Sequence, residues 1–429
     1  MIMKKNVMYG TLYLMSAQAA FVASGYMINV GLGRLLGPGD YGVYAVVISM
    51  MTMVNLILTT GIPQAVSKYV AHGIGSSATI KETALKMQSV FSVAIFLIYF
   101  FLAEKIALLL NDSTLTPFIR ASAFIVPGYA VYSILIGYLN GLLEYRKQAI
   151  TTIYYSLFKV VFILTLVIAG YSVMGAIVGF VFAPIAALLV GAYFTRIGGI
   201  SLQPNNDESM NSSISVKKIL DFSIPIMFFS VATNLIISID LFFVKAYLTN
   251  YETGIYSAAS MISKVPFFMI GGLYGAIFPA ISNASANNNI LRTRKYILNS
   301  FKYSLIAMIP AVIVISAFSK TLITIVYSGE YASGADVLSI LIFSLGFYSL
   351  FFLFMTVLNG SGRPYISLFM SIIVLALDVL LNIILVPVYH LIGAAAATGL
   401  ASVAGFVMAA IYINWKFGVF TPERYLLKM

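Results

Sequence analysis

The sequence has no cysteine, two histidines and few charged residues, and each of these shortages excludes a class of site. A chain without cysteine forms neither disulfides nor thiolate metal sites. The two histidines, His72 and His390, are too far apart in the sequence to indicate a ligand cluster. Charged residues make up 9% of the chain, against about 25% in soluble domains, and hydrophobic residues make up 61%. This composition predicts an all-α polytopic membrane protein.

The chain also lacks the sequence patterns of nucleotide-driven and metal-dependent enzymes. It contains no Gly-x-x-x-x-Gly-Lys-[Ser/Thr] segment, no cluster of metal ligands and no soluble segment long enough to bind a nucleotide. We therefore expect neither an enzyme nor a bound cofactor, and only coupling to H⁺ or Na⁺ stays open. The net charge of +11 does not indicate a nucleic-acid partner, because the charges lie in short segments between apolar runs.

Long apolar runs recur along the chain. A window of about 20 residues, the length that crosses a bilayer, divides them into twelve predicted spans, six on each side of a polar stretch. The expected domains are an N-terminal six-helix lobe at 1–195, a cytoplasmic linker at 196–218 and a C-terminal six-helix lobe at 219–429. The predicted spans are 9–31, 41–62, 85–110, 117–141, 149–170, 173–195, 219–246, 254–280, 298–327, 336–359, 365–387 and 391–415.

The distribution of lysine and arginine predicts the orientation in the membrane. If the N-terminus is cytoplasmic, most of the 25 lysines and arginines fall in cytoplasmic segments. The outer segments then contain only Arg34, Lys105, Arg120, Lys245 and Lys320. Positive residues concentrate on the cytoplasmic side of membrane proteins. We therefore expect a multi-pass protein of the cytoplasmic membrane with both termini in the cytoplasm.

The two halves of the sequence resemble each other. Leu139-Asn140-Gly141 in the first half matches Leu358-Asn359-Gly360 in the second. Other matches occur in the same order and at similar offsets, and they pair Tyr41–Ala45 with Thr253–Ser257, Ile62-Pro63 with Phe278-Pro279, and Gly175-Ala176 with Gly393-Ala394. These matches predict a duplication that produced two pseudo-symmetric lobes. With six spans in each copy, both copies begin on the same side of the membrane, and substrate sites in such folds lie near the midplane between the copies.

Ionisable side chains within the predicted spans are candidates for function, because a charge in the membrane interior is costly. The deepest are Lys159, Lys264 and Asp378, and Asp240 lies in the outer half of its span. Lys159 and Asp378 are separated by the same offset as the two Leu-Asn-Gly segments, so we expect them at equivalent positions of the repeat. Our hypothesis is that Lys159 and Lys264 bind an anionic head group, while Asp378 and Asp240 serve coupling or charge pairing. The alternative is a Lys159–Asp378 bridge that only holds the lobes together.

Arg34 and Lys245 form a second pair of equivalent positions, at the predicted outer ends of two spans. Their cations could bind the anionic head as it leaves the protein. The alternative, which we favour, is that both side chains snorkel toward the membrane interface.

Several segments together resemble one known family. They are Gly33–Ala45, with the sequence GRLLGPGDYGVYA, Gly61-Ile62-Pro63, Asp240–Lys245 followed by Thr253–Ala259, and Leu358–Gly362. With these segments the chain resembles, over its whole length, the Wzx-type flippases, which are polysaccharide-biosynthesis membrane proteins of the MATE-like MOP superfamily. The resemblance implies a twelve-helix, two-lobed carrier. Such a carrier moves polyprenyl-diphosphate-linked oligosaccharides from the cytoplasmic to the outer leaflet by alternating access.

The resemblance also implies partners, and two other functions stay open. The implied partners are the lipid-linked oligosaccharide, membrane lipids, and the polysaccharide polymerase and glycosyltransferases of O-antigen or exopolysaccharide export. One alternative is a cation-coupled multidrug exporter on the same fold, although the lysines within spans favour an anionic substrate. The second alternative is a polymerase or ligase acting on lipid-linked glycans. Such an enzyme is expected to have a large outer loop, and every predicted outer loop is short.

Overall fold

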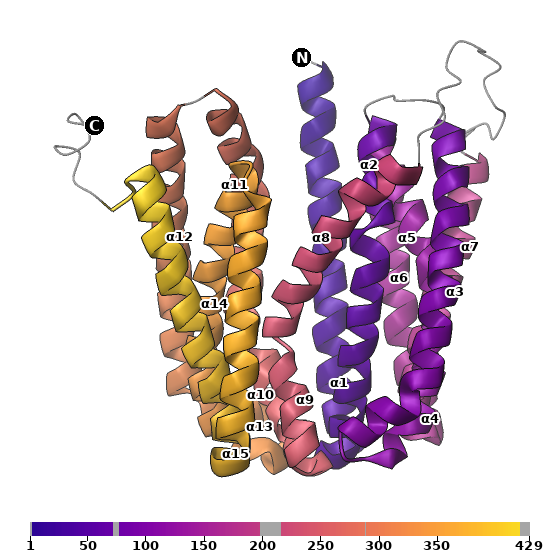
Figure 1. Ribbon diagram of the computed structural model, residues 1–429. Helices are drawn as coiled ribbons and strands as arrows, with labels where there is room; N and C mark the ends of the chain where they lie inside the picture. Colours follow the sequence, from indigo (N-terminus) through magenta and orange to yellow (C-terminus); the bar gives the residue numbers. More distant parts are fainter. Residues whose placement is uncertain (1, 72–76, 198–215, 288, 421–429) are drawn as a thin grey trace. The chain divides into compact units, whose positions relative to one another are not determined.

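The computed structural model describes residues 2–71, 77–197, 216–287 and 289–420, and every regular element in these ranges is helical (Figure 1). The predicted all-α class is confirmed for these ranges. The elements are α1 (Ile2–Thr60), α2 (Ile62–Ala71), α3 (Ser77–Leu109), η1 (Ser113–Leu115), α4 (Thr116–Ala123), α5 (Ile125–Gly141), α6 (Tyr145–Leu166), η2 (Val167–Tyr171), α7 (Ser172–Ile197), α8 (Val216–Ile236), α9 (Ile239–Tyr247), α10 (Asn250–Ser263), α11 (Val265–Ala286), α12 (Ile290–Ala317), α13 (Ser319–Val326), η4 (Gly329–Gly334), α14 (Ala335–Gly360) and α15 (Pro364–Phe417).

Three helical stretches are much longer than one membrane span needs. They contain 62, 47 and 54 residues, against about 20 for a single span. Each is interrupted by a residue with positive φ, namely Gly37, Gly170 and His390. Among the described residues, eight stretches are long and apolar enough to cross a membrane, or nine with the bent pair Ile226–Ile236 and Ile239–Tyr247. The chain is therefore a multi-span membrane protein, and the count of twelve stays a prediction that depends on dividing the long stretches at their breaks.

The break in α1 replaces the connecting loop that the sequence predicts between 31 and 41. Gly37 has φ 71° and ψ 172°, and Pro38 follows it. A residue before proline avoids the helical conformation, and glycine adopts positive φ without a steric penalty. The chain therefore reverses over very few residues, and helical structure continues almost to the break on both sides.

Unusual backbone conformations recur at equivalent positions of the two halves. Leu143 and Gly362 follow the two Leu-Asn-Gly segments, and their φ angles are 59° and 77°. Ser172 and His390, which precede the matching Gly-Ala segments by the same number of positions, have φ/ψ of 44°/−136° and 53°/−130°. Non-glycine residues rarely adopt positive φ. The agreement of backbone geometry at both pairs supports the duplication that the sequence matches predict.

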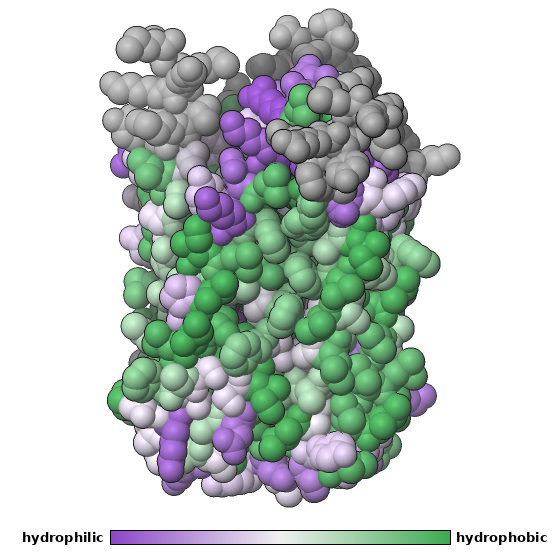
Figure 2. Space-filling view, turned by 90° about the vertical axis from the view of Figure 1, so that its left-hand side faces the viewer, coloured by the Kyte–Doolittle hydropathy of each residue, from purple (hydrophilic) through white to green (hydrophobic). Residues whose placement is uncertain are grey.

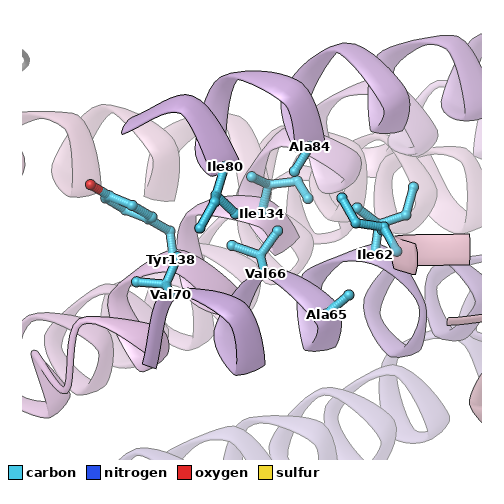
Figure 3. Packing of buried hydrophobic residues seen from close by; sticks show 9 residues of the cluster. Ile62, Ala65, Val66, Val70, Ile80, Ala84, Ile134 and Tyr138 are labelled. Carbon is cyan, nitrogen blue, oxygen red and sulfur yellow. The ribbon is translucent and has the colours of Figure 1, made fainter. Parts of the chain in front are cut away.

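The structure consists of two compact units, residues 1–231 and 232–429, and each is described by itself. The division lies within α8, so the first part of this helix packs with the N-terminal unit. Its Ile219 is fully buried against α2, α3 and α5, in a cluster that also contains Ile62, Val66 and Ile134 (Figure 3). Residues 198–215 of the linker lie outside the described residues. The predicted domain bounds at 195 and 219 therefore stay predictions.

Much of the surface has the composition of a lipid-facing surface. Figure 2 shows one face on which hydrophobic residues cover the middle, while hydrophilic residues gather toward the two ends. Along α12, the apolar side chains of Ile306, Ile309 and Ile313 are exposed in succession. Such side chains are stable in contact with lipid, which makes the buried polar residues the more informative ones.

Candidate functional site

Lys159 is a buried cation surrounded by aromatic rings in the N-terminal unit. It lies on α6 with 4% of its surface exposed. Its Nζ lies 4.6 Å from the ring centre of Phe21 on α1, 5.7 Å from that of Tyr155 and 5.5 Å from that of Phe180 on α7. Aromatic faces attract a cation. No carboxylate of the described residues forms an ion pair with Lys159, so its charge is available to an anionic ligand.

A cavity of about 620 Å³ lies next to this cation and shares Phe21 and Tyr155 with it. We call it the polar pocket. Helices α1, α2, α5 and α6 line it, and its volume is typical of small-molecule sites, which measure about 300–1,000 Å³. No aspartate or glutamate of the described chain lines the polar pocket, whereas Lys68 does. The pocket therefore favours neutral or anionic ligands over cationic ones.

Four side-chain amides line the polar pocket without protein partners. They belong to Gln18 on α1, Gln64 on α2, Asn140 on α5 and Gln148 on α6. Within the described ranges, no hydrogen bond joins these side chains to another residue, and Gln148 Oε1 is buried. A buried polar atom without a partner is costly. Gln148 Oε1 is therefore placed to accept a hydrogen bond from a ligand, and the exposed side chains of Gln18 and Gln64 can bond to the same ligand.

Aromatic side chains form one wall of the polar pocket. The ring centres of Tyr132 and Tyr155 lie 5.0 Å apart, and Tyr129 lies 5.6 Å from Tyr132 and 5.9 Å from Tyr155. Ala183 and Ala187 of α7 pack behind these rings, and the small side chains allow α7 to approach closely. Rigid aromatic faces beside amide groups offer both apolar contact and hydrogen bonds, which a sugar ring requires.

The C-terminal unit contains a buried carboxylate cluster around Asp240, which lies on α9 and is 2% exposed. Asp240 Oδ2 accepts hydrogen bonds from the hydroxyls of Tyr256 on α10 at 2.5 Å and Thr398 on α15 at 3.2 Å. Its Oδ1 accepts one from the backbone N–H of Leu241 at 2.8 Å. Three donors thus fix the carboxyl group of Asp240 inside the unit.

Asp378 on α15 belongs to the same cluster and is fully buried. Its Oδ1 accepts a hydrogen bond from Asn382 Nδ2 at 3.0 Å, whereas Oδ2 is buried without a hydrogen-bond partner in the described chain. Asp378 interacts electrostatically with Asp240, and Lys264, a half-buried residue between α10 and α11, also interacts with Asp240. Two carboxyl groups and one ammonium group therefore share this small region.

The predicted site residues thus occupy different places. Lys264, Asp240 and Asp378 lie together in the C-terminal unit, and Lys159 lies in the N-terminal unit. Lys159 and Asp378 do occupy equivalent positions, since each is buried and lies at the same position counted from the start of its helix, α6 or α15. Because each unit is described by itself, a Lys159–Asp378 bridge stays a prediction.

Arg34 and Lys245 differ more than their equivalent sequence positions suggest. Arg34 is exposed near the break in α1, whereas Lys245 on α9 is only 5% exposed. The snorkelling interpretation therefore fits Arg34 and is wrong for Lys245, whose side chain packs inside its unit. Both residues interact with neighbouring groups. Their role in binding an anionic head stays a prediction.

The amide groups of the polar pocket are not among the site residues predicted from the sequence. One signal was present in α2, where Gln64, Ser67 and Lys68 have the spacing of one helix face, while Ala65 and Val66 face the buried cluster. Asn382, one helical turn after Asp378, was a similar signal for the carboxylate cluster. In the described residues, no group of three or more His, Cys, Asp or Glu side chains is arranged to hold a metal ion.

Comparison with known proteins relates this architecture to glycan transport. A family model described as polysaccharide biosynthesis protein matches residues 32–336. A probable low-salt glycan biosynthesis flippase of Haloferax volcanii is 27% identical over 175 residues, which are 41% of this chain and 37% of the relative. The succinoglycan biosynthesis transport protein of Rhizobium meliloti is 21% identical over 356 residues, 80% of this chain and 67% of that protein.

Comparison of structures identifies the fold. A multidrug resistance MATE family transporter of the MOP superfamily, solved in an inward-facing conformation, matches with a TM-score of 0.79 and 14% identity over 96% of this chain and 100% of that one. A MOP superfamily transporter from Pyrococcus furiosus, described as having a binding pocket of reverse polarity, matches with a TM-score of 0.69 and 17% identity over 96% of both chains. The chain therefore has the same fold as these transporters.

Proposed function

The chain belongs to the polysaccharide biosynthesis protein family, and from this premise we propose that it is a flippase for polyprenyl-diphosphate-linked oligosaccharides. In this proposal it carries the lipid-linked glycan across the cytoplasmic membrane by alternating access, with both termini in the cytoplasm. The transporter fold and the relatives named as flippase and transport protein support a transport role rather than an enzymatic one. The glycan polymerase and glycosyltransferases are the proposed partners that consume and supply the substrate.

The observation that carries the proposal is the polar pocket beside Lys159. A glycan head group is strongly hydrated and cannot enter hydrocarbon unaided. The unpartnered amides of Gln18, Gln64, Asn140 and Gln148 can replace part of its hydration shell, and the tyrosines give the sugar rings an apolar face. The pocket thus has the chemistry that a hydroxyl-rich head requires.

Cationic side chains fit the diphosphate of the same substrate. Lys159 is adjacent to the polar pocket and makes no ion pair with a described carboxylate, so a diphosphate is a suitable counter-ion. We assign Lys159 and Lys264 to binding of the diphosphate during transport. Arg34 and Lys245, which lie close to the ends of their spans, are assigned to binding it as the head leaves.

The carboxylate cluster is the proposed site of coupling to an ion gradient. Two carboxylates that lie close together in a buried environment repel each other. It is therefore costly for both to be charged without a counter-ion. A proton or a sodium ion bound at Asp240 and Asp378 relieves this repulsion, and the unpartnered Oδ2 of Asp378 offers it an acceptor. Binding and release of that ion would bias the protein between its two access states.

One observation favours a cation-coupled multidrug exporter as the second candidate. The buried carboxylates of the C-terminal unit could attract a cationic drug, and the matching MATE transporters share the fold. The polar pocket argues against this candidate, because its lining contains a cation and no described acid.

Flipping assays in proteoliposomes test the proposal. The native chain should move radiolabelled undecaprenyl-diphosphate oligosaccharide between leaflets. The Lys159→Ala and Lys264→Ala variants should lose this transport, while the control Lys105→Ala, which removes an exposed cation, should retain it. Export of a cationic dye against a proton or sodium gradient, with no movement of the lipid-linked glycan, would establish the multidrug exporter instead.

A further inference from the structure

A second hollow of the N-terminal unit is almost entirely apolar. It measures about 710 Å³ and lies between α3 and the first part of α8, with Gly61 and Ile62 also in its lining. We call it the apolar groove. Its lining includes Met87, Val90 and Phe228, and among the described lining residues only Ser223 and Lys86 have polar side chains. Such a surface binds hydrocarbon and excludes the hydrated head group.

The apolar groove is elongated along its two helices. On α3 it is lined by Lys86, Val90 and Ala94, which are separated by one helical turn each and extend over about 12 Å at 1.5 Å per residue. On α8 it is lined by Ile224 and Phe228, which are also one turn apart. Val90 and Phe228 are 74% and 57% exposed, so the groove is open along its side. An open, elongated slot fits an extended chain.

The apolar groove and the polar pocket share one wall. Gly61 and Ile62 line the apolar groove, and the next two residues, Pro63 and Gln64, line the polar pocket. The wall is firmly packed, because α2 is held against α3 and α5 by the buried cluster around Val66 (Figure 3). One unit therefore presents a hydrocarbon-binding surface and a hydroxyl-binding surface next to each other.

The one cation in the described lining of the apolar groove lies at one end of it. Lys86 precedes Val90 and Ala94 on α3, so it is the lining residue of α3 nearest the start of that helix. Its Nζ lies 2.9 Å from the Glu82 carboxylate, and both side chains are largely exposed. An exposed ion pair of this kind contributes little to stability, so a phosphate group can replace the carboxylate. Cation and hydrocarbon surface together match an anionic lipid with a long chain.

We propose that the apolar groove binds the isoprenoid chain of the transported lipid, with Lys86 facing its phosphate as the lipid enters. The inference rests on the flippase function proposed above. The sugar head occupies the polar pocket while the chain lies across the shared wall in the groove. An ordinary phospholipid has neither the glycan nor the long branched chain, so it does not satisfy both surfaces at once.

Photo-cross-linking of the full chain tests which lipid occupies the apolar groove. The protein is reconstituted in vesicles of phosphatidylethanolamine and phosphatidylcholine with undecaprenyl phosphate that has a diazirine in its chain. The label should map to the groove residues of α3, which are Lys86, Met87, Val90, Phe91 and Ala94, and to those of α8, which are Ser223, Ile224, Met227 and Phe228. Unlabelled undecaprenyl phosphate should displace it, whereas the same excess of phosphatidylglycerol should not. Label that spreads to Val93 and Leu97, which are exposed on α3 outside the groove, or that phosphatidylglycerol displaces equally, would show that ordinary lipids occupy the groove.

Groove-filling variants give a second readout. Ala94→Trp fills the groove and should lower the labelling about tenfold, which corresponds to losing the burial of about two methylene groups. The matched control Val93→Trp adds the same ring to an exposed neighbouring position outside the groove and should label as the native chain does. Met227→Trp fills the groove from α8 and should reproduce the loss, so the test does not depend on one variant folding. Equal labelling of all variants would overturn the inference.

The role of Lys86 is tested separately with a neutral probe. Lys86→Gln should weaken labelling by the photoreactive undecaprenyl phosphate and leave labelling by the corresponding uncharged undecaprenol unchanged. Equal weakening of both probes, or of neither, would contradict the assigned role of the cation. These assays measure binding alone, so they can be read whether or not the protein transports the lipid. Specific labelling without glycan flipping would refute the flippase function alone, whereas flipping without specific labelling would refute the groove alone.

Discussion

Asn382 donates its side-chain amide to Asp378 across one turn of α15, at 3.0 Å, and this hydrogen bond leaves the second carboxylate oxygen buried without a partner in the described chain. The amide therefore orients the carboxyl group and occupies only one of its two oxygens. Asp378 thus has one oxygen that can accept a further partner, as the proposed coupling role requires. The hydrogen bond also shows which substitution removes the charge and preserves the packing.

Asp378→Asn should lower gradient-driven transport by about tenfold or more, which corresponds to roughly 1.4 kcal/mol. The asparagine retains an oxygen that accepts the hydrogen bond from Asn382, so the fold should be preserved. Initial transport rates in proteoliposomes with and without an imposed proton or sodium gradient measure the effect. Asp336→Asn, at an exposed position of α14, is the matched control and should have no effect. An Asp378→Asn variant that still responds fully to the gradient would remove Asp378 from the coupling site.

Gln148→Leu should weaken glycan transport without destabilising the protein. The amide of Gln148 makes no hydrogen bond to the described protein, so its removal leaves no protein group unpaired, whereas a bound sugar loses a partner. We expect the half-saturating concentration of lipid-linked glycan to rise about tenfold, as for one lost ligand hydrogen bond of roughly 1–1.5 kcal/mol.

Gln88→Leu is the matched control for this variant. Gln88 is buried, whereas Gln148 is half-buried, and the amide of Gln88 donates to the Leu58 carbonyl oxygen at 2.9 Å. Its removal should lower the thermal unfolding temperature in detergent, because that carbonyl loses a donor. If Gln148→Leu destabilised the protein as much as Gln88→Leu does, the unpartnered amide would be structural rather than part of a ligand site.

Lys159→Met should raise stability and lower transport together. Burial of an ammonium group without a paired carboxylate is costly, and methionine fills similar space without charge. The loss of cation–π attraction offsets part of the gain, so we expect the free energy of unfolding to rise by about 1 kcal/mol. Thermal unfolding and flipping are measured on the same preparation. A variant that loses stability would indicate that Lys159 holds the unit together.

Gly393→Ala should destabilise the C-terminal unit. A Cβ at Gly393 would collide with the backbone carbonyl of Leu385 on the preceding turns of α15, which cannot move without opening the tight reversal at His390. Overpacking of this kind costs about 1–3 kcal/mol. Gly271→Ala is the control, since nothing lies within 4 Å of its Cβ position. Equal unfolding temperatures of the two variants would contradict the close approach.

The sequence predicted those features that depend on a single helix or on the match between the two repeats. The rarity of charge predicted the membrane fold, and the matching Leu-Asn-Gly segments predicted equivalent positions for Lys159 and Asp378, which the structure places at the same register. The tight breaks were harder to locate. A residue such as Ser172 or His390 with positive φ has no sequence signal of its own, because tertiary packing imposes that conformation.

The polar pocket was not predictable for a different reason. Its amides come from four separate helices, and each is an ordinary polar residue in its own segment. Only packing reveals that Gln18, Asn140 and Gln148 surround one volume. The burial of Ile219 of α8 against α2 likewise depends on packing, and the polar composition of the preceding segment does not indicate it.

Lys159 and Asp378 also have a consequence for the history of the chain. They are equivalent positions of one duplicated structure, and they now have opposite charges. A half-length ancestor that assembled as two identical copies would have had the same side chain at both positions, because one gene encoded both. Fusion of the copies into one chain removed that constraint. Each half could then have its own side chain at this position, a lysine in one and an aspartate in the other.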